Sequence, residues 1–250
     1  MLGHLELGVA ERQLILHATV VGRVLPCTHE LRVLGHFAQS LSRIERVPDR
    51  LYFTDSDEAN ELIAKDPMAL LIGFSLDQQV TVQQAFMGPL RLRERLGSLD
   101  PGALAAADLE PLFRQKPAIH RFPGNMAQRV HALAVDVRDH YGGAAARVWS
   151  DAADSAQLRR NISELPGFGE MKVKALGAVL AKRFGVAAAQ GLVPSHPTLG
   201  DVDSGQALND YQAAKRERKK SPRAERDGVG KPTPSSRARS IASGRKQGSR

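Results

Sequence analysis

Residues 67–76 limit most strongly how this chain can fold. The segment reads PMALLIGFSL and is almost entirely apolar, and the residues before it are Lys65 and Asp66. Asp66 is a favoured residue at a helix N-cap, and Pro67 suits the first helical position, so we predict a helix that begins there. A helix that is apolar on every side has to be buried. We therefore expect this helix to lie in the core of the domain.

Apolar residues at helical spacing predict further helices along most of the chain, and no segment predicts a β-sheet. Leu, Ala and Val supply most of the apolar residues, which favours an all-α fold. Pro111 is expected to break or restart the helix in which it falls. The other helices are predicted at 29–44, from Thr54 or Asp55 to Ala64, from 82 through Leu90, 103–113, from Gly124 or Asn125 to His140, 155–163, 171–184 and 206–220.

The chain divides into three parts by composition. Residues 1–50 form an N-terminal extension, whose role the sequence leaves open. Residues 51–204 hold the predicted helical domain, although order is expected to fade after Gly185. Residues 205–250 form a basic tail, and its part from 221 onward is rich in Ser, Pro, Gly, Lys and Arg, which predicts disorder.

The positive charge of the chain belongs to that tail. Residues 215–250 contain 13 Lys or Arg and 3 Asp or Glu, a net charge of +10. The whole chain carries +8, so the other 214 residues carry −2. Such a tail either contacts nucleic acid non-specifically or is a solvated segment that aids solubility.

The cysteine content excludes several kinds of site. Cys27 is the only cysteine, so an internal disulfide, a four-cysteine zinc site and an iron–sulfur cluster are all excluded. The histidines do not follow a metal-binding spacing. No apolar run reaches 18 residues, and the N-terminus does not read as a signal peptide, so we expect a cytoplasmic protein without a membrane partner.

A short turn at residues 165–169 is the first candidate binding site. It reads LPGFG and lies between a helix that ends near Glu164 and a second amphipathic helix. The free backbone N–H groups at the start of that second helix form a natural seat for a phosphate. Lys172 and Lys174 could add positive charge beside it. The alternative is an ordinary connection between two helices with a glycine stop.

Three segments together resemble one known superfamily. They are the turn at 165–169 with its flanking helices, the sequence 66–81 with its apolar helix and the polar DQQVT that follows, and the segment 122–143 that ends in HYGG. Over residues 55–190, their order and spacing are similar to those of the helix-hairpin-helix (HhH-GPD) superfamily of base-excision DNA glycosylases. The double glutamine is more similar to the AlkA-like branch than to the endonuclease III branch.

This resemblance implies an all-α domain of two helical lobes with a DNA cleft between them. The partner would be double-stranded DNA that contains a damaged base, bound by a monomer at the nucleoid. By the resemblance, Gln79 would enter the duplex where a base leaves the stack, with Gln78 beside it, although both could simply form a polar helix end. Gly167, Phe168, Gly169 and the backbone near Lys172 would hold phosphate, in some members of the superfamily with a monovalent cation.

Two positions depart from the pattern of the superfamily. The lysine that serves bifunctional members is replaced by Met171, which favours a monofunctional enzyme without β-lyase activity. No acid lies in residues 187–192, where the family aspartate is expected. Asp201 and Asp203 are the nearest candidates for the catalytic acid, and both could instead be surface acids. His120 and Arg121 either face DNA or lie in a surface loop.

The sequence therefore leaves three functions open. The first is a DNA glycosylase that removes a damaged base by hydrolysis of its N-glycosidic bond. The second is a non-catalytic DNA-binding relative that has lost the catalytic aspartate. The third is a helical scaffold whose basic tail binds RNA or membrane.

Overall fold

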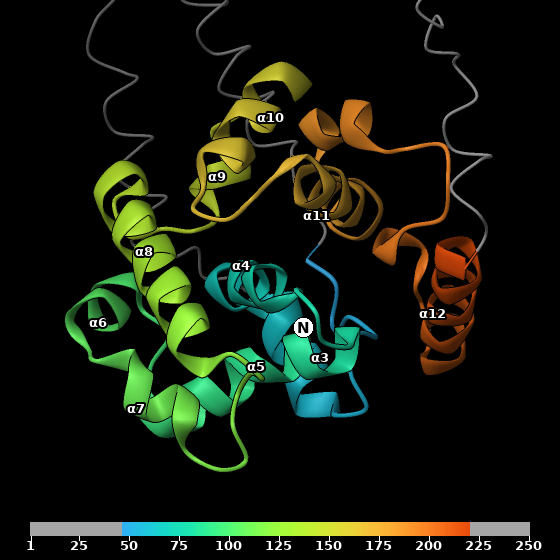
Figure 1. The fold of residues 1–250 in the computed structure, drawn as a ribbon. Coiled ribbons are helices and arrows are strands. Elements are labelled where there is room, and N and C mark those ends of the chain that lie inside the picture. Colours follow the sequence, from blue (N-terminus) through green and yellow to red (C-terminus); the bar gives the residue numbers. More distant parts are fainter. Residues whose placement is uncertain (1–46, 221–250) are drawn as a thin grey trace, which may run out of the picture. The chain divides into compact units, whose positions relative to one another are not determined.

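The computed structural model describes residues 47–220, and all of its regular elements are helical (Figure 1). The described residues contain no strand, so the all-α prediction is confirmed for this part of the chain. The helix expected at 29–44 and the disorder expected from 221 onward lie outside the described residues. The helices are α3 (Asp57–Lys65), α4 (Pro67–Leu76), α5 (Val82–Leu96), α6 (Pro101–Ala106), α7 (Leu109–Arg114), α8 (Pro123–Tyr141), α9 (Arg147–Ser150), α10 (Ser155–Glu164), α11 (Glu170–Arg183) and α12 (Gly205–Lys220), with 3-10 helices η1 (Ala187–Leu192) and η2 (Leu199–Asp201).

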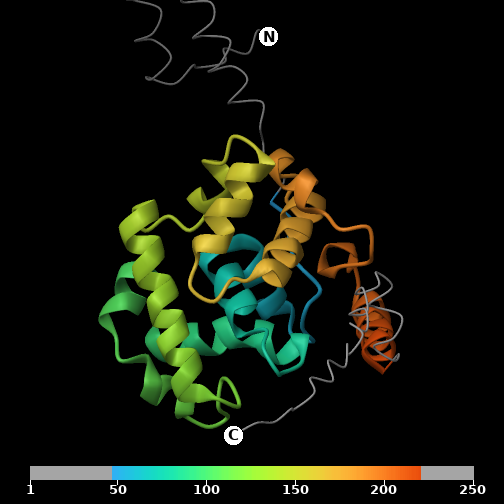
Figure 2. The same cartoon turned by 45° about the horizontal axis from the view of Figure 1, so that its top comes forward.

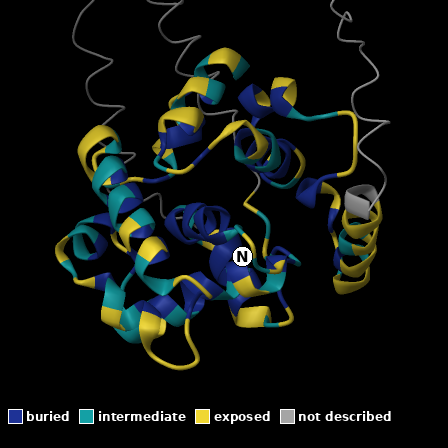
Figure 3. Cartoon of the chain, in the orientation of Figure 1, coloured by how far each residue is buried: buried dark blue, intermediate teal, exposed yellow. Residues whose placement is uncertain are grey.

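Helix α4 is the centre of the core. Every residue from Met68 to Leu76 is buried, and α3, α5 and α8 pack around the helix (Figure 3). The Asp66 carboxylate caps it by accepting hydrogen bonds from the Met68 N–H at 2.8 Å and the Ala69 N–H at 3.2 Å. The prediction of a buried helix that begins at Pro67 is therefore confirmed, together with its cap.

Helix α3 begins later than the sequence predicted. Its cap is Ser56, whose hydroxyl accepts a hydrogen bond from the Ala59 N–H at 3.3 Å. Thr54 is not available as a cap because its hydroxyl lies 3.0 Å from both the Ser56 carbonyl and the Asn60 side-chain oxygen. The local side-chain bonds of Thr54 thus move the start of the helix downstream.

The segment predicted as one helix at 103–113 forms two. The backbone is extended at Ala107, and Asp108 caps α7 by accepting a hydrogen bond from the Glu110 N–H at 3.2 Å. Pro111 falls in the first turn of α7, where a helix does not use the backbone N–H. The chain therefore breaks before Pro111 and not at it.

Helix α8 has the glycine stop that the sequence predicted. Gly142 and Gly143 have φ values of 61° and 78°, in the left-handed region that glycine adopts readily. The helix begins at Pro123, one residue before the predicted start, since proline is well suited to the first helical position.

Between Gly185 and Lys220, where the described residues end, the chain forms regular elements, contrary to the prediction that order fades after Gly185. Elements η1 and η2 pack against α11, and Leu192, Leu199 and Val202 are buried. Gly200 lies so close to the Ala178 carbonyl that a side chain could not be accommodated there without movement. These scattered apolar contacts have no helical period, so the sequence pattern did not show them. The helix predicted at 206–220 is confirmed as α12.

The elements are arranged around α4. In both views of the ribbon, α8 lies on one side of α4 and α11 on the other, and α12 lies at the outer edge beyond α11 (Figures 1 and 2). Helices α6 and α7 pack on α8, and η2 contacts α12. None of the described helices has the length and apolar content needed to span a bilayer.

Candidate nucleic-acid interface

Three segments that are distant in the sequence line one open cleft of about 560 Å³. They are the turn after α4, the residues that lead into α8 and form its first turns, and the turn between α10 and α11. We refer to this feature as the cleft. Its lining residues are Gln78, Gln79, His120, Phe122, Asn125, Met126, Gln128, Arg129, Pro166 and Gly167.

The turn after α4 has a strained backbone. At Asp77 the φ and ψ angles are −70° and 70°, and the Gln78 N–H donates to the Leu76 carbonyl at 2.7 Å, which is an inverse γ-turn. Gln79 then has a φ of 55°, the one positive φ outside glycine in the described residues. Such a conformation is uncommon for glutamine and is often found at functional sites. It leaves the Gln79 side chain exposed at the cleft.

His120 joins this turn to the segment before α8. Its side chain is buried, with 4% exposure, and its Nε2 lies 3.0 Å from the Gln78 carbonyl oxygen. The Phe122 N–H donates to the Nδ1 of His120 at 3.1 Å. Because Nδ1 accepts, Nε2 must carry the proton and donate to Gln78, so the ring is neutral. Burial lowers the pKa of His120, against the opposing effect of its backbone hydrogen bonds.

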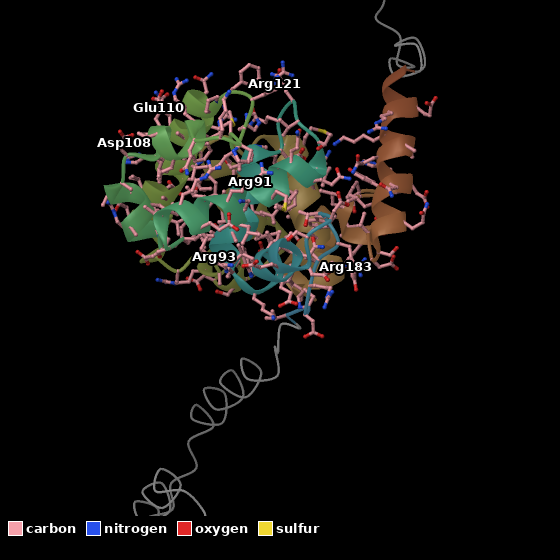
Figure 4. The ribbon with its side chains drawn as sticks, turned by 90° about the horizontal axis from the view of Figure 1, so that it is seen from below. Arg91, Arg93, Asp108, Glu110, Arg121 and Arg183 are labelled. Atoms are coloured by element: carbon pink, nitrogen blue, oxygen red, sulfur yellow. The ribbon has the colours of Figure 1, made fainter. Side chains whose placement is uncertain are left out.

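The next two residues form the rim of the cleft. Phe122 is one of the few large apolar side chains that are exposed, at 38%. The Arg121 guanidinium lies 4.8 Å from the centre of the Phe122 ring, within the range of a cation–π contact. Figure 4 shows Arg121 at the edge of the molecule, well separated from Arg183. The rim thus presents a positive charge and an aromatic face to solvent.

The turn between α10 and α11 has the open backbone that the sequence predicted. Gly167 has a φ of 82°, and the Phe168 N–H donates to the Leu165 carbonyl at 3.0 Å. Gly169 is the N-cap of α11 and provides no capping side chain. A Cβ atom at Gly169 would meet nothing within 4 Å, so the start of α11 is open to an approaching group. The first N–H groups of a helix have no partners within the helix, and they suit an anion.

Arg129 supplies the positive charge beside this turn. A Cβ atom built at Gly167 would lie 2.9 Å from the Cδ and 3.1 Å from a terminal nitrogen of Arg129, so the side chain lies directly over the glycine. Within the described part of the chain, Arg129 forms no ion pair. The absence of a side chain at residue 167 therefore makes room for a guanidinium group at the cleft.

The two predicted lysines of α11 are bound to other groups of the protein. Lys174 lies 3.4 Å from Glu170, which also binds Arg159 at 2.7 Å. The Nζ of Lys172 donates to the Ser75 carbonyl at 3.0 Å and lies 5.3 Å from the centre of the Phe168 ring. Neither lysine lines the cleft. Lys172 instead ties α11 to the end of α4.

Lys172 and Asp77 have perturbed acidity behind the cleft. Burial, and then the charge of Arg129, lower the pKa of Lys172 to about 8, and the charge of Asp77 acts in the opposite direction. Burial also raises the pKa of Asp77, while the positive charges of Lys215 and Lys172 oppose that change. The charges of Asp77 and Lys172 thus each act on the pKa of the other.

The two candidate catalytic acids lie away from the lining of the cleft. Asp201 accepts hydrogen bonds from the Lys182 Nζ at 2.6 Å and from the backbone N–H and hydroxyl of Thr198 at 2.8 and 3.0 Å. Partial burial acts to raise the pKa of Asp201, but these hydrogen bonds hold it below its usual value. Asp203 is exposed. No Asp or Glu is among the cleft residues in the part of the chain that the structure describes.

Several cleft residues were not singled out from the sequence. Asn125, Gln128 and Arg129 are spaced by three and one residues, which places them on one polar face of α8. That stripe was the available signal, but a polar stripe is also the normal solvent face of a helix. Phe122 had no such signal, because a lone aromatic residue before a proline is most often a packing residue.

Comparisons with protein-family models, with curated proteins and with solved structures find no match to this chain. Within residues 47–220, no group of three or more His, Cys, Asp or Glu side chains is placed to hold a metal ion.

Proposed function

We propose that the cleft binds double-stranded DNA around a base that has left the stack, and that the chain is a base-excision repair protein of the monofunctional DNA glycosylase type. The observation that most supports this proposal is that the cleft is lined by the three segments on which the resemblance to the HhH-GPD superfamily rests. The arrangement in two lobes and the closer similarity to the AlkA-like branch are part of the proposal. The protein would act as a monomer at the nucleoid.

The turn between α10 and α11 would bind the DNA backbone. The open N–H groups that follow Gly169 suit a phosphate, and Gly167 lets Arg129 add a positive charge at the same place. Phe168, which is buried, anchors the turn, and Lys172 holds α11 to α4. In this proposal Lys172 therefore positions the phosphate site, and Lys174 pairs with Glu170; neither contacts the phosphate.

The opposite wall of the cleft would open the duplex. Flipping a base out of the stack costs a few kcal/mol, and a side chain that fills the gap offsets part of this cost. Gln79, next to Gln78 on a strained and rigidly held turn, is suited to fill the gap. Phe122 provides an exposed ring on which a base can stack, and such stacking contributes about 1–3 kcal/mol per base.

Hydrolysis of the N-glycosidic bond needs a carboxylate to stabilise the oxocarbenium-like sugar and to orient water. In this proposal the acid is Asp203 or Asp201. Asp203 is the better candidate of the two, because the carboxylate of Asp201 already accepts hydrogen bonds from Lys182 and Thr198. Either acid would have to reach the sugar from outside the cleft lining.

The cleft lining also favours a second function. Because no described carboxylate lines the cleft, the same geometry suits a DNA-binding protein that recognises an extruded base without cleaving it. The two functions share all contacts to DNA and differ only in the hydrolytic step.

A monovalent cation at the α10–α11 turn, which the resemblance allows, does not fit the residues found there. The Arg129 guanidinium lies over Gly167 and already places a positive charge against the turn. A second cation at the same place would be repelled. No step of the proposed function uses one.

The deciding experiment is an assay for abasic sites. The full chain is incubated with duplexes that carry alkylated, deaminated or oxidised bases, and abasic sites are detected by strand cleavage in hot alkali. The glycosylase function predicts abasic sites with at least one lesion and their loss in Asp203→Asn or Asp201→Asn. Binding to a lesion duplex with no abasic site from any lesion would instead establish the non-catalytic function.

The phosphate seat is tested by Gly169→Ala. This methyl group meets nothing in the protein, so the free energy of unfolding should change little, while the group would intrude on a phosphate bound at the start of α11. We expect DNA affinity to fall at least tenfold. Gly102→Ala, on α6 and outside the cleft lining, is the control; its methyl group would lie 3.0 Å from the Asp100 carboxylate, so the free energy of unfolding is measured for both variants. Equal affinities for the two variants would contradict a phosphate at this turn.

A further inference from the structure

Helix α12 is fixed to the domain next to the start of α5. Leu208 is buried with 1% exposure, and Ser204 caps the helix by accepting a hydrogen bond from the Ala207 N–H at 3.1 Å. The side-chain amide of Gln212 donates to the side-chain oxygen of Gln83 at 2.8 Å. The first part of the basic tail is therefore an ordered helix with a defined position.

That position is close to the cleft. Gln83 follows Gln79 by four residues, a length of chain that spans at most about 14 Å. Lys215 lies three residues after Gln212, a rise of about 4.5 Å along the helix. The charge of Lys215 also acts on Asp77, two residues before Gln79. One helical turn of DNA spans about 34 Å, so Lys215 lies within one turn of a base held at Gln79.

The C-terminal part of α12 carries the positive charge that a contact with the DNA backbone requires. Lys215 and Arg216 are exposed, and the Lys215 Nζ lies 5.9 Å from the centre of the Tyr211 ring. Figure 3 shows most of this helix as exposed. Five of the six residues at 215–220 are Lys or Arg, and the sixth is Glu217. A helix with this composition complements the phosphate backbone of a nucleic acid.

We propose that α12 binds phosphates of the same duplex that occupies the cleft, within one helical turn of the extruded base. This inference rests on the proposed function, and it assigns to the duplex a second contact surface that the cleft does not contain. The contact holds the flanking backbone while the turn at Gln79 opens the stack. It carries no base specificity, because it reaches only phosphates.

The test compares two double variants of the full chain that remove the same charge. One is Lys215→Gln with Arg216→Gln on α12. The other, the control, is Arg50→Gln with Lys65→Gln, residues whose ion pairs with Asp57 and Glu61 lie at α3. Lys65 directly precedes Asp66, the cap of α4, so it lies at the opposite end of α4 from the cleft.

The measurement is the affinity for a labelled duplex of about two helical turns (~21 bp), with salt varied from about 50 to 200 mM. The slope of log K against log salt is negative, and each lost phosphate contact reduces its magnitude by about 0.9. We expect the α12 variant to reduce the magnitude of the slope by about 1.8 and the control variant to leave it unchanged. Equal slopes for the two variants would overturn the inference.

The outcomes separate this inference from the proposed function. If Gly169→Ala weakens binding and the α12 variant does not, the cleft binds DNA and the inference about α12 is wrong. If the wild-type chain does not bind the duplex, both are wrong. A loss of binding to vesicles of anionic phospholipid in the α12 variant, with its duplex slope intact, would assign α12 to a membrane surface and also overturn the inference.

A second variant tests the position of the helix separately from its charge. Gln83→Ala removes the hydrogen bond that holds α12 beside α5 but changes no charge. We expect it to reduce the magnitude of the slope, as the α12 variant does, by a smaller amount. Leu208 stays buried in this variant, so the helix loosens without leaving the domain; a slope of larger magnitude than that of the wild type would contradict the position that we propose.

Discussion

The Nε2 atom of His120 lies 3.0 Å from the carbonyl oxygen of Gln78, a residue 42 positions earlier in the chain. The same ring accepts a hydrogen bond from the Phe122 N–H through Nδ1. One neutral imidazole therefore joins the strained turn after α4 to the rim of the cleft. Protonation of Nδ1 would remove its ability to accept the second hydrogen bond.

This arrangement predicts a loss of stability in mild acid. Burial lowers the pKa of His120 below its ordinary value of 6.5, so the unfolded chain binds the proton more readily. The stabilising contribution is complete above pH 6.5 and is lost as the pH falls through the lowered pKa. Urea unfolding between pH 5 and pH 8 should show this decrease, and His120→Gln should reduce its steepness.

His140→Gln is the control for this prediction. The His140 side chain is 70% exposed and pairs with Asp136 on the same helix, so its removal should leave the acid-induced decrease in place. If His120→Gln retained the full pH dependence of the wild type, the decrease would have to come from other groups.

A second prediction concerns the backbone of Gln79. With a φ of 55°, Gln79→Gly should relieve strain and leave stability unchanged or raised by about 1 kcal/mol. The same substitution removes the side chain that we place in the duplex. We expect weaker base extrusion, measured by the fluorescence of 2-aminopurine in the bound duplex. Gln79→Ala retains the strain and should show the same loss of base extrusion. If only Gln79→Gly weakened extrusion, the backbone conformation and not the side chain would be responsible.

A feature of this fold or of the cleft could be predicted from the sequence when the residues that form it are neighbours in the chain. The cap at Asp66, the buried α4 and the turn at 165–169 depend on adjacent residues, and the sequence predicted all three. The bond from His120 to Gln78 and the position of Arg129 over Gly167 depend on the path of the chain between them. No local pattern contains that information.

A third prediction concerns β-lyase chemistry. The Lys172 Nζ donates to the Ser75 carbonyl, and by the proposed resemblance Met171 occupies the position that holds a lysine in bifunctional members of the HhH-GPD superfamily. The wild-type chain should form no covalent complex with abasic DNA when borohydride is added. Met171 is 76% exposed, so Met171→Lys should fold normally and test whether an amine at that position reaches the sugar. A borohydride-trapped complex of the wild type would contradict this assignment.

A fourth prediction concerns Arg129. Arg129→Met keeps an unbranched side chain over Gly167 and removes the charge, so stability should change by less than about 0.5 kcal/mol. The slope of log K against log salt for DNA binding should fall in magnitude by about 0.9, which corresponds to one phosphate contact. Arg147→Met on α9, which removes the ion pair with Asp151, is the matched control and should leave the slope unchanged.

The sequence and the structure differ most over the two lysines of α11. Their position in the sequence beside Gly169 suggested direct phosphate contacts. In the structure Lys174 pairs with Glu170, and Lys172 points to the end of α4. The direction of a long side chain depends on which acceptors lie nearby: the acceptor of Lys174 is on its own helix, and the acceptor of Lys172 comes from α4. The positive charge at the turn comes from α8, a helix that begins 42 residues before Leu165.

The burial of α4 also affects how the cleft moves. A helix that is covered on every side cannot separate from the domain without exposing its whole apolar surface, so its amides should exchange with solvent only when the domain unfolds globally. The turn at Gln78 and Gln79 directly follows this most protected segment. The wall of the cleft that would meet the duplex is therefore rigid, and opening the stack would require the DNA to deform while the protein keeps its shape.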